Sequence, residues 1–330
     1  MAHILLIKYY VINKIEGGRD MKKGVNSYAF IAMAGILWST LGLFGNILME
    51  RGLSSEQVAF TRLFIGFIVL SLYSLIRRPE VLKINLKCLL YCGAIGIICQ
   101  GLFNKCYFKA VEVTGVSIAA VLLYTSPLFL AVFSKMVYKE KMTRAKIISL
   151  ILCCIGAIMA VTGGVLDLEG INTYGIIMGI MAAITYALMP IISKNALKEF
   201  SSETILIYGF LFGAMFMIPS AKPVEMMGFV TNMNVLPYMI LLGVFPAAMA
   251  YIFYAEGIAR GCELSIVGVV ASVELIAASI IGWTVVGEVF TIGKAIGVAI
   301  MFVSAFTAVA GNKEVEAESV EEMEAEAYVG

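Results

Sequence analysis

Charged residues are scarce in this chain: Asp, Glu, Lys and Arg make up 14% of its 330 residues, whereas apolar side chains make up 61%. That composition leaves too little polar surface to coat a water-soluble globule. Apolar runs of about 20 residues, the length that spans a bilayer as a helix, follow one another with only short, turn-rich segments between them. A soluble domain therefore has no room, and we expect an all-α integral membrane protein.

Histidine occurs only once, at His3. The seven cysteines all lie in or at the ends of apolar runs, without the short loops of a disulfide framework, so they are interpreted as small buried hydrophobes. Four of them lie near one helix face (Cys88, Cys92, Cys99 and Cys106). Because imidazole, the commonest partner in such sites, is absent there, we expect no metal site and no cofactor.

Motifs that carry out chemistry are also missing. The chain has no phosphate-binding GxxxxGKS loop, which makes direct ATP hydrolysis improbable. It has no HExxH, no GxSxG and no paired Asp and His constellation that would serve a membrane-embedded enzyme. The sequence therefore favours a protein that is not an enzyme.

Ten apolar segments are long enough to cross a bilayer as helices. They cover residues 28–49, 57–76, 86–108, 116–137, 146–164, 174–193, 204–220, 236–255, 264–286 and 292–310. Because short loops join them, neighbouring helices should run antiparallel.

The basic residues orient these spans. With a cytoplasmic N-terminus, 18 of the 24 Lys and Arg residues fall in inner segments and five in outer segments, while Arg62 lies inside a span. This is a positive-inside distribution. We expect a multi-pass protein of the cell membrane, inner or plasma, with both termini in the cytoplasm.

The two halves of the chain repeat each other at a constant offset of 148 residues. The motif Glu140-x-x-Thr143 recurs as Glu288-x-x-Thr291. Further pairs at this offset are Lys146 and Lys294, Ser117 and Ser265, Ala157 and Ala305, and Gly163 and Gly311. Each copy holds five spans, an odd number, so the second copy must insert upside down relative to the first. Inverted repeats create a site near the midplane that is reachable alternately from either side, which is transporter architecture.

Longer motifs follow one another in a specific order. They are GILWSTLGLFGNILM, Arg62-Leu63-Phe64, Ser126-Pro127, Lys139-Glu140-x-x-Thr143, Glu274-Leu275 and Gly287-Glu288-x-x-Thr291. Together they resemble the paired EamA repeats of the drug/metabolite transporter superfamily, over residues 27–311. The resemblance implies a ten-helix carrier, commonly an exporter of amino acids, related metabolites or drugs. The chain departs from the family at Leu275, where proline often follows the glutamate, so no proline supplies a kink there.

The repeats divide the chain into an N-terminal segment (1–25), a first repeat (26–163), a second repeat (172–311) and a tail (312–330). Codons for Glu16-Gly17-Gly18 can spell a ribosome-binding sequence ahead of Met21. We therefore hypothesise that residues 1–20 are not translated, and an intact mass that includes Met1 would end that hypothesis. The glutamate-rich tail is expected to be a solvated, disordered cytoplasmic end.

Glu274 is the strongest candidate for a substrate-binding residue. It lies about ten residues into its span, near mid-depth at ~1.5 Å per residue, where ionisable groups are costly and usually functional. It would bind a substrate amine or a proton, and the alternative is a structural hydrogen bond to another helix. Its counterpart in the first repeat is Ser126, followed by Pro127, which removes a hydrogen bond in mid-helix.

Other polar and aromatic residues extend this candidate site. Gln100 and Asn104 are four residues apart and share a helix face, where they either line the cavity or join helices. Five aromatic residues lie away from the membrane interfaces where such residues normally collect: Trp38, Tyr124, Tyr186, Tyr251 and Tyr254. They predict an aromatic-lined pocket, with core packing as the alternative for each one.

The remaining charges in or beside spans are given structural roles. Arg62, Lys105 and Lys109 are placed toward outer ends, where long side chains reach water. Glu140 and Glu288 are expected to anchor the ends of helices rather than to contact substrate.

Taken together, these features predict a secondary transporter that exports small polar metabolites such as amino acids by alternating access. Proton-coupled efflux of cationic drugs, with Glu274 as the proton and cation site, is an alternative, and a passive channel is a further one. The expected partners are a small-molecule substrate and the lipid bilayer, with no nucleic acid, and the chain is expected to act as a monomer or homodimer.

Overall fold

The computed structural model describes residues 27–165 and 172–329, with the side chains of 312–329 left out. Within these ranges all regular secondary structure is helical, without strands, and short turns and loops join the helices. The N-terminal segment, including Met21, lies outside the described residues. The hypothesis that residues 1–20 are not translated therefore stays a prediction.

Ten described helices are long and apolar enough to cross a membrane, which confirms the ten predicted spans. They are Ser27–Glu50, Ser55–Arg77 (α2), Leu86–Thr114, Val116–Tyr138, Arg144–Thr162 (α7), Thr173–Ala196 (α8), Ser202–Ala221 (α9), Leu236–Ala259, Leu264–Val286 and Ile292–Gly311, the last being the first part of α15 (Ile292–Val329).

Four of these spans are divided into shorter elements. The third span contains α3 (Leu86–Gly93), η2 (Ala94–Leu102) and α4 (Phe103–Thr114), and the fourth contains α5 (Val116–Leu123) and α6 (Ser126–Tyr138). The eighth span contains α11 (Leu236–Gly243), η4 (Val244–Met249) and α12 (Ala250–Ala259). The ninth span contains α13 (Leu264–Ala271), α14 (Val273–Ile281) and η5 (Gly282–Val286). Three short helices lie in the connections: η1 (Pro79–Leu82), η3 (Pro223–Met226) and α10 (Met227–Val230).

Polar caps start corresponding helices of the two repeats. At α2, the Ser54 hydroxyl accepts a hydrogen bond from the Gln57 backbone N–H (3.2 Å) and the Gln57 side chain accepts one from the Ser54 N–H (3.0 Å). At α9, the Ser201 hydroxyl accepts from the Thr204 N–H (3.2 Å). These bonds satisfy backbone donors that have no partner inside the helix.

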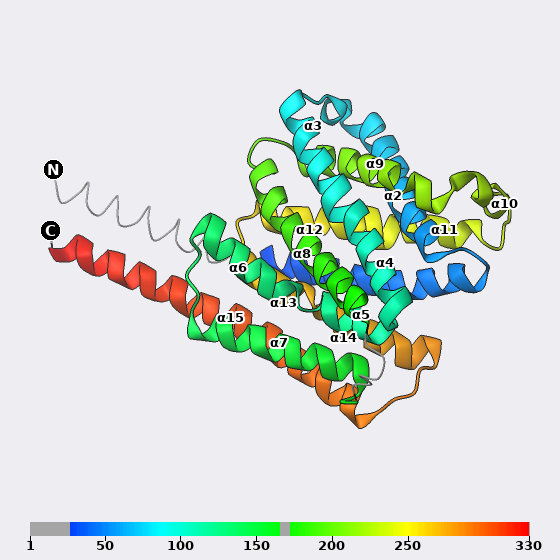
Figure 1. Cartoon of the computed structure of the whole chain (residues 1–330). Helices are drawn as coiled ribbons and strands as arrows, with labels where there is room; N and C mark the ends of the chain where they lie inside the picture. Colours follow the sequence, from blue (N-terminus) through cyan, green and yellow to red (C-terminus); the bar gives the residue numbers. More distant parts are fainter. Residues whose placement is uncertain (1–26, 166–171, 330) are drawn as a thin grey trace.

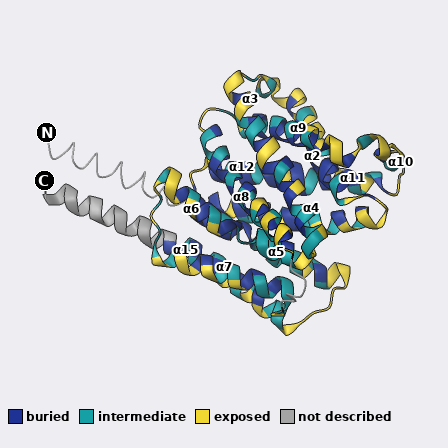
Figure 2. Ribbon diagram, viewed as in Figure 1, coloured by how far each residue is buried: buried dark blue, intermediate teal, exposed yellow. Residues whose placement is uncertain are grey.

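Figure 2 shows exposed positions along the outside of the helices. Many of these exposed residues are large and apolar. Leu72, Ile76, Met136 and Phe306 are examples. The interior is also apolar and includes Phe210, Leu242, Ile258 and Leu264. An exposed apolar surface of this extent is typical of a protein surrounded by lipid.

Helices α7 and α15 show how the two repeats are related, and they lie side by side along one edge of the bundle (Figure 1). Gly163, just after α7, lies against Thr291, just before α15. At the other end, Gly311 of α15 lies against Ala145 of α7. The two helices are therefore antiparallel.

The same pair of helices makes its contacts reciprocally at the offset of 148 residues. The Ser304 hydroxyl of α15 donates to the Ser149 carbonyl oxygen of α7 (2.6 Å). The counterparts of these two residues, Gly156 and Gly297, also lie against each other. Such an exchange of contacts is what a pseudo-twofold axis between inverted repeats produces.

The fourth and ninth spans are each broken, and the two breaks lie at equivalent positions of the two repeats. The first break is at Tyr124, where α5 ends, and Pro127 stands in the first turn of α6. The second is at Ser272, 148 residues later. Here no proline is present. Instead the Ser272 hydroxyl donates to the Gly268 carbonyl oxygen (2.9 Å), and such side-chain bonds compete with the helix ladder and bend helices.

The described backbone of α15 continues as a helix through residue 312 to Val329. The expectation of a solvated, disordered cytoplasmic tail stays a prediction. Ala, Glu and Met are strong helix formers. A helix that is already nucleated in the membrane segment extends without the cost of a new nucleus.

The bundle has two ends that are bonded differently. The Glu140 end comprises the turn 139–143 and the loop 260–263, and ion pairs between the two repeats gather on this side: Lys146–Glu263, Lys194–Glu140 (3.5 Å), Arg78–Glu203 (3.3 Å) and Lys87–Glu199 (2.6 Å). The Glu288 end comprises residues 287–291 and the α4–α5 junction. Its described ion pairs stay within one repeat: Lys109–Glu112, Lys222–Glu225 and Lys294–Glu288.

Candidate functional site

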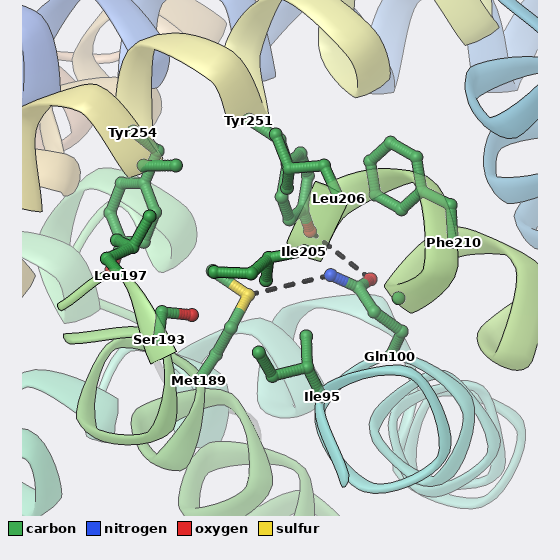
Figure 3. A pocket seen from close by; sticks show the side chains of 12 residues that line it. Ile95, Gln100, Met189, Ser193, Leu197, Ile205, Leu206, Phe210, Tyr251 and Tyr254 are labelled. Carbon is green, nitrogen blue, oxygen red and sulfur yellow. Dashed lines mark hydrogen bonds between the residues drawn. The ribbon is translucent and has the colours of Figure 1, made fainter. Parts of the chain in front are cut away.

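Gln100 is the centre of a buried polar network. It lies on the π-helical segment η2, a kind of segment that is frequent at functional sites. Its side-chain oxygen accepts hydrogen bonds from Arg62 Nη2 (3.4 Å) and the Tyr251 hydroxyl (3.2 Å). Its side-chain nitrogen lies 3.5 Å from Met189 Sδ (Figure 3). Gln100 thus connects α2, α8 and α12, and a role in binding substrate stays a prediction.

Arg62 was wrongly placed by the sequence. It was expected to reach water near an outer membrane end, but its residue is only 5% exposed and bonds to Gln100 inside the bundle. Its Nε atom has no hydrogen-bond partner among the described residues. The signal that could have found it is the position itself, because an arginine well inside a span is a functional candidate.

Three aromatic residues pack together beside this network. The ring of Trp38 lies 5.2 Å from that of Tyr251 and 5.0 Å from that of Tyr254, between centroids. All three residues are buried. The Trp38 Nε1 donor has no described partner, although a buried indole N–H usually finds one.

Glu274 stands in the first turn of α14, directly after the break at Ser272. Glu274 is half-buried. Gly35 of the first helix packs against the backbone around the break, where a side chain at position 35 would collide with the Ala271 carbonyl oxygen and approach the Glu274 backbone N. The break is a single turn residue between α13 and α14, and interrupted helices of this kind line the site in other carriers. Glu274 is therefore placed at an irregular backbone segment inside the membrane region.

The charge of Glu274 acts on several groups around it. The positive charge of Arg62 interacts electrostatically with the Glu274 carboxylate. The negative charge of Glu274 also interacts with the phenols of Tyr107, Tyr124 and Tyr186. Glu274 forms no ion pair with Arg62 among the described contacts. Glu274 thus lies within electrostatic range of Tyr124, Tyr186 and Arg62. Arg62 bonds to Gln100, which accepts a hydrogen bond from Tyr251 of the Trp38 cluster.

Two other predicted residues have no described side-chain-to-side-chain bond with this group. Asn104 is buried, and its side-chain nitrogen donates to the Gln100 carbonyl oxygen of its own helix (2.6 Å). Ser126 is buried at the start of α6, where it occupies the position equivalent to Glu274. Their assignment as substrate-binding residues stays a prediction.

A small pocket lies between η2, α8, α9 and α12 (Figure 3). Gln100 and Tyr251 form one boundary, while Ser193 and Leu197 at the end of α8 form another. Its lining is mostly apolar and does not include Glu274. The pocket therefore extends from the polar network toward the Glu140 end of the bundle.

Glu140 anchors a helix end, as its sequence position predicted. Its carboxylate accepts hydrogen bonds from the backbone N–H groups of Leu264 and Ser265, both at 2.9 Å, and Lys194 lies 3.5 Å away. Burial alone would raise the pKa of Glu140, but the two backbone bonds and Lys194 outweigh it and hold the pKa below its ordinary value. The N-terminus of α13 is thereby capped by a charge from the other repeat.

No cluster of His, Cys, Asp and Glu suited to a metal ion occurs in the described parts of the chain. The seven cysteines are unpaired thiols. The chemistry available at the site is therefore that of one carboxylate, one guanidinium, an amide and several phenols.

Comparison with known families matches both halves of the chain. The model described as "EamA-like transporter family" matches residues 26–162 and again residues 173–310. Among curated proteins, an uncharacterized transporter of Clostridium kluyveri is 27% identical over 305 residues, covering 89% of this chain and 95% of that protein. The uncharacterized transporter YetK of Bacillus subtilis is 24% identical, covering 92% of this chain and 93% of its own length.

A similar arrangement of helices has been solved before. A crystal structure described only as that of a protein superimposes with a TM-score of 0.74, covering 88% of this chain and 99% of the other. The sequences are 18% identical, so this likeness concerns the fold alone.

Proposed function

We propose, from the premise that this chain belongs to the EamA-like transporter family, that it is a secondary carrier that exports small polar metabolites such as amino acids by alternating access. Family membership makes the protein a transporter rather than an enzyme. Its ten apolar helices make it a multi-pass membrane protein. The substrate and the mechanism are the proposed parts.

The observation that carries the proposal is the pair of opposite charges inside the bundle. Arg62 is buried on α2, Glu274 is half-buried on α14, and the described contacts include no ion pair between them. Each charge costs free energy in the membrane interior unless a partner is found. A zwitterion such as an amino acid supplies both partners, its amine to Glu274 and its carboxylate to Arg62.

The unsatisfied atoms support the same ligand chemistry. Arg62 Nε and Trp38 Nε1 are both donors without a described acceptor. A substrate carboxylate is an acceptor for both. The phenols of Tyr124 and Tyr186 add aromatic surface near Glu274, which suits the apolar part of an amino acid.

Efflux of cationic drugs is less well supported by this geometry. The positive charge of Arg62 acts on Glu274 and opposes a second cation beside it. A drug cation would also leave the donors of Arg62 and Trp38 unpaired.

The proposed orientation places the Glu140 end in the cytoplasm. Basic side chains concentrate there, including Lys139, Lys141, Arg144 and Lys194, as the positive-inside distribution requires. The protein would then lie in the cell membrane with export directed toward the Glu288 end.

Counterflow in proteoliposomes tests this function. Purified protein is reconstituted with one unlabelled L-amino acid inside, and uptake of the same labelled compound is followed, for each of the twenty standard amino acids in turn. For each active compound, the methyl ester removes the negative charge and the N-acetyl derivative removes the positive charge. We expect counterflow of at least one amino acid and of neither of its derivatives.

Variants assign the two charges. Glu274→Gln and Arg62→Gln should each lower counterflow at least about tenfold, as expected for losing a charged hydrogen-bond partner. Arg62→Lys should retain part of the activity. Glu256→Gln is the matched control because its exposed pair with Arg260 lies at the bundle end. Equal transport of all three compound forms, or unchanged activity of both Gln variants, would refute the zwitterion site.

A further inference from the structure

The two repeats make one of their equivalent contacts but not the other. Glu140 binds the N–H groups of Leu264 and Ser265 at the start of α13. At the offset of 148 residues, the equivalent contact joins Glu288 to Val116 and Ser117 at the start of α5. The structure instead leaves Val116 66% exposed, whereas its counterpart Leu264 is fully buried.

Among the described residues, Glu288 has no comparable partner in this state. Its side chain is 50% exposed, and its described ion pair is with Lys294 of the same repeat, at 3.7 Å. Its backbone N–H donates to the Gly282 carbonyl oxygen (2.9 Å), which holds the turn, and its half-exposed carboxylate lies beside Gly282. The residue is available to bind elsewhere.

Neither broken helix provides its own side-chain cap. The N-cap of α5 is Gly115, which has no side chain, and the N-cap of α13 is Glu263, which makes no capping bond. The first N–H groups of an α-helix need acceptors from outside the helix, and a carboxylate is favoured there. For α13 that acceptor is Glu140, while α5 has the same need at the opposite end.

We propose that Glu288 is the gating residue of the Glu288 end: in the state opposite to this structure, its carboxylate accepts hydrogen bonds from the Val116 and Ser117 N–H groups, while Glu140 releases Leu264 and Ser265. This inference rests on the proposed function, because it assigns the two contacts to the two states of alternating access. The Glu140 contact holds the start of α13 against the turn 139–143 of the first repeat. The Glu288 contact would hold the start of α5 against residues 287–291 of the second repeat. Exchange of two similar contacts keeps the two states close in free energy.

The structure also explains why the Glu140 end is the closed one here. Lys146 pairs with Glu263 at that end. The counterpart of Lys146 is Lys294, but Gly115 occupies the position equivalent to Glu263, so the second ion pair cannot form at the Glu288 end. The additional pair stabilises closure at the Glu140 end and makes the observed state the resting state.

Two thiol reporters measure this exchange without any substrate. Cys262 is native, buried and adjacent to the Glu140 contact, while Ser117 is exposed at the Glu288 end and tolerates Ser117→Cys because the proposed contact uses its backbone N–H. The purified full-length protein is reacted with N-ethylmaleimide, and each site is quantified by mass spectrometry. The parent protein should label rapidly at position 117 and slowly at Cys262.

Glu140→Gln should raise the labelling rate of Cys262 roughly tenfold and lower that of position 117, because loss of a charged acceptor weakens two bonds. Adding Glu288→Gln to that variant should restore labelling at position 117, since the opposite contact is then also lost. Glu256→Gln should leave both rates unchanged. Size-exclusion chromatography confirms that each variant is folded.

One result overturns the gate. If Glu140→Gln exposes Cys262 but position 117 labels at the same rate with and without Glu288→Gln, Glu140 is only a helix cap and Glu288 has no gating role. Failure of the proposed function is distinguished by the counterflow assay. Reciprocal labelling without counterflow refutes the amino-acid carrier, whereas counterflow without reciprocal labelling refutes the gate.

Discussion

The Lys146–Glu263 ion pair provides the sharpest test of how the Glu140 end is held together. The Lys146 side chain is 2% exposed, and its ammonium group donates both to the Glu263 carboxylate and to the Lys141 carbonyl oxygen (2.9 Å). The Glu263 side chain is 34% exposed. Changing Glu263→Gln leaves a buried lysine charge without its counter-ion, whereas Lys146→Met leaves a carboxylate that water can still reach.

The expected costs follow from this asymmetry. Removing one partner of a fully buried pair costs about 3 to 5 kcal/mol. Partial exposure of Glu263 and the retained bond to Lys141 reduce the expectation for Glu263→Gln to roughly 2 kcal/mol. Lys146→Met should cost about 1 kcal/mol or less, because an exposed carboxylate loses little with its partner. The double variant should resemble Lys146→Met, so the coupling equals the cost of Glu263→Gln, about 2 kcal/mol.

Thermal unfolding in detergent, followed by intrinsic fluorescence, measures this cycle. Glu263→Gln should lower Tm by a few degrees, taking the roughly 2 to 4 °C per kcal/mol that holds for chains of about 150 to 250 residues as an upper guide. Adding Lys146→Met should recover part of the loss. Glu256→Gln, in an exposed pair with Arg260, is the matched control and should leave Tm unchanged. An unchanged Tm for Glu263→Gln, or a double variant equal to the sum of the singles, would show that the pair does not stabilise this end.

Three further expectations follow from individual residues. Because the pKa of Glu140 is below its ordinary value of 4.5, the stability that its carboxylate contributes is present above pH 4.5 and is lost as pH falls through the lowered pKa. On acidification the Tm of the parent protein should therefore drop more steeply than that of Glu140→Gln. Parallel curves of Tm against pH for the two proteins would contradict this. Gly297→Leu should destabilise the protein by about 2 kcal/mol or more, because any side chain there collides with the backbone at Ala160, whereas Gly228→Leu, in open space, should have little effect on Tm. Burial raises the pKa of the Cys262 thiol to about 12, so its alkylation at pH 8 should be slow in the folded protein and fast after denaturation; equal rates would show that the loop is open.

The sequence alone predicted the ten spans, because hydrophobic length is a local property, and the inversion of the repeats, because five spans per copy leave no other orientation. It also placed Glu140 at a helix end, since the residue stands between two apolar runs. These inferences needed only the order and spacing of residues along the chain.

Other features were decided by packing between distant segments. The sequence could not show that Arg62 turns inward, because that depends on Gln100 of another helix and on the face of α2 that the bundle covers. It offered no proline to predict the break at Ser272, which a serine-to-backbone bond accompanies instead.

The difference between the two ends of the bundle is the clearest case of tertiary control. Glu140 and Glu288 stand in nearly identical local motifs, yet only Glu140 meets a helix N-terminus in this state. The repeated sequence places the same motif in both halves of the chain. The tertiary structure determines that the contact is made at the Glu140 end, because the start of α13 packs against Glu140 whereas Val116 at the start of α5 is exposed.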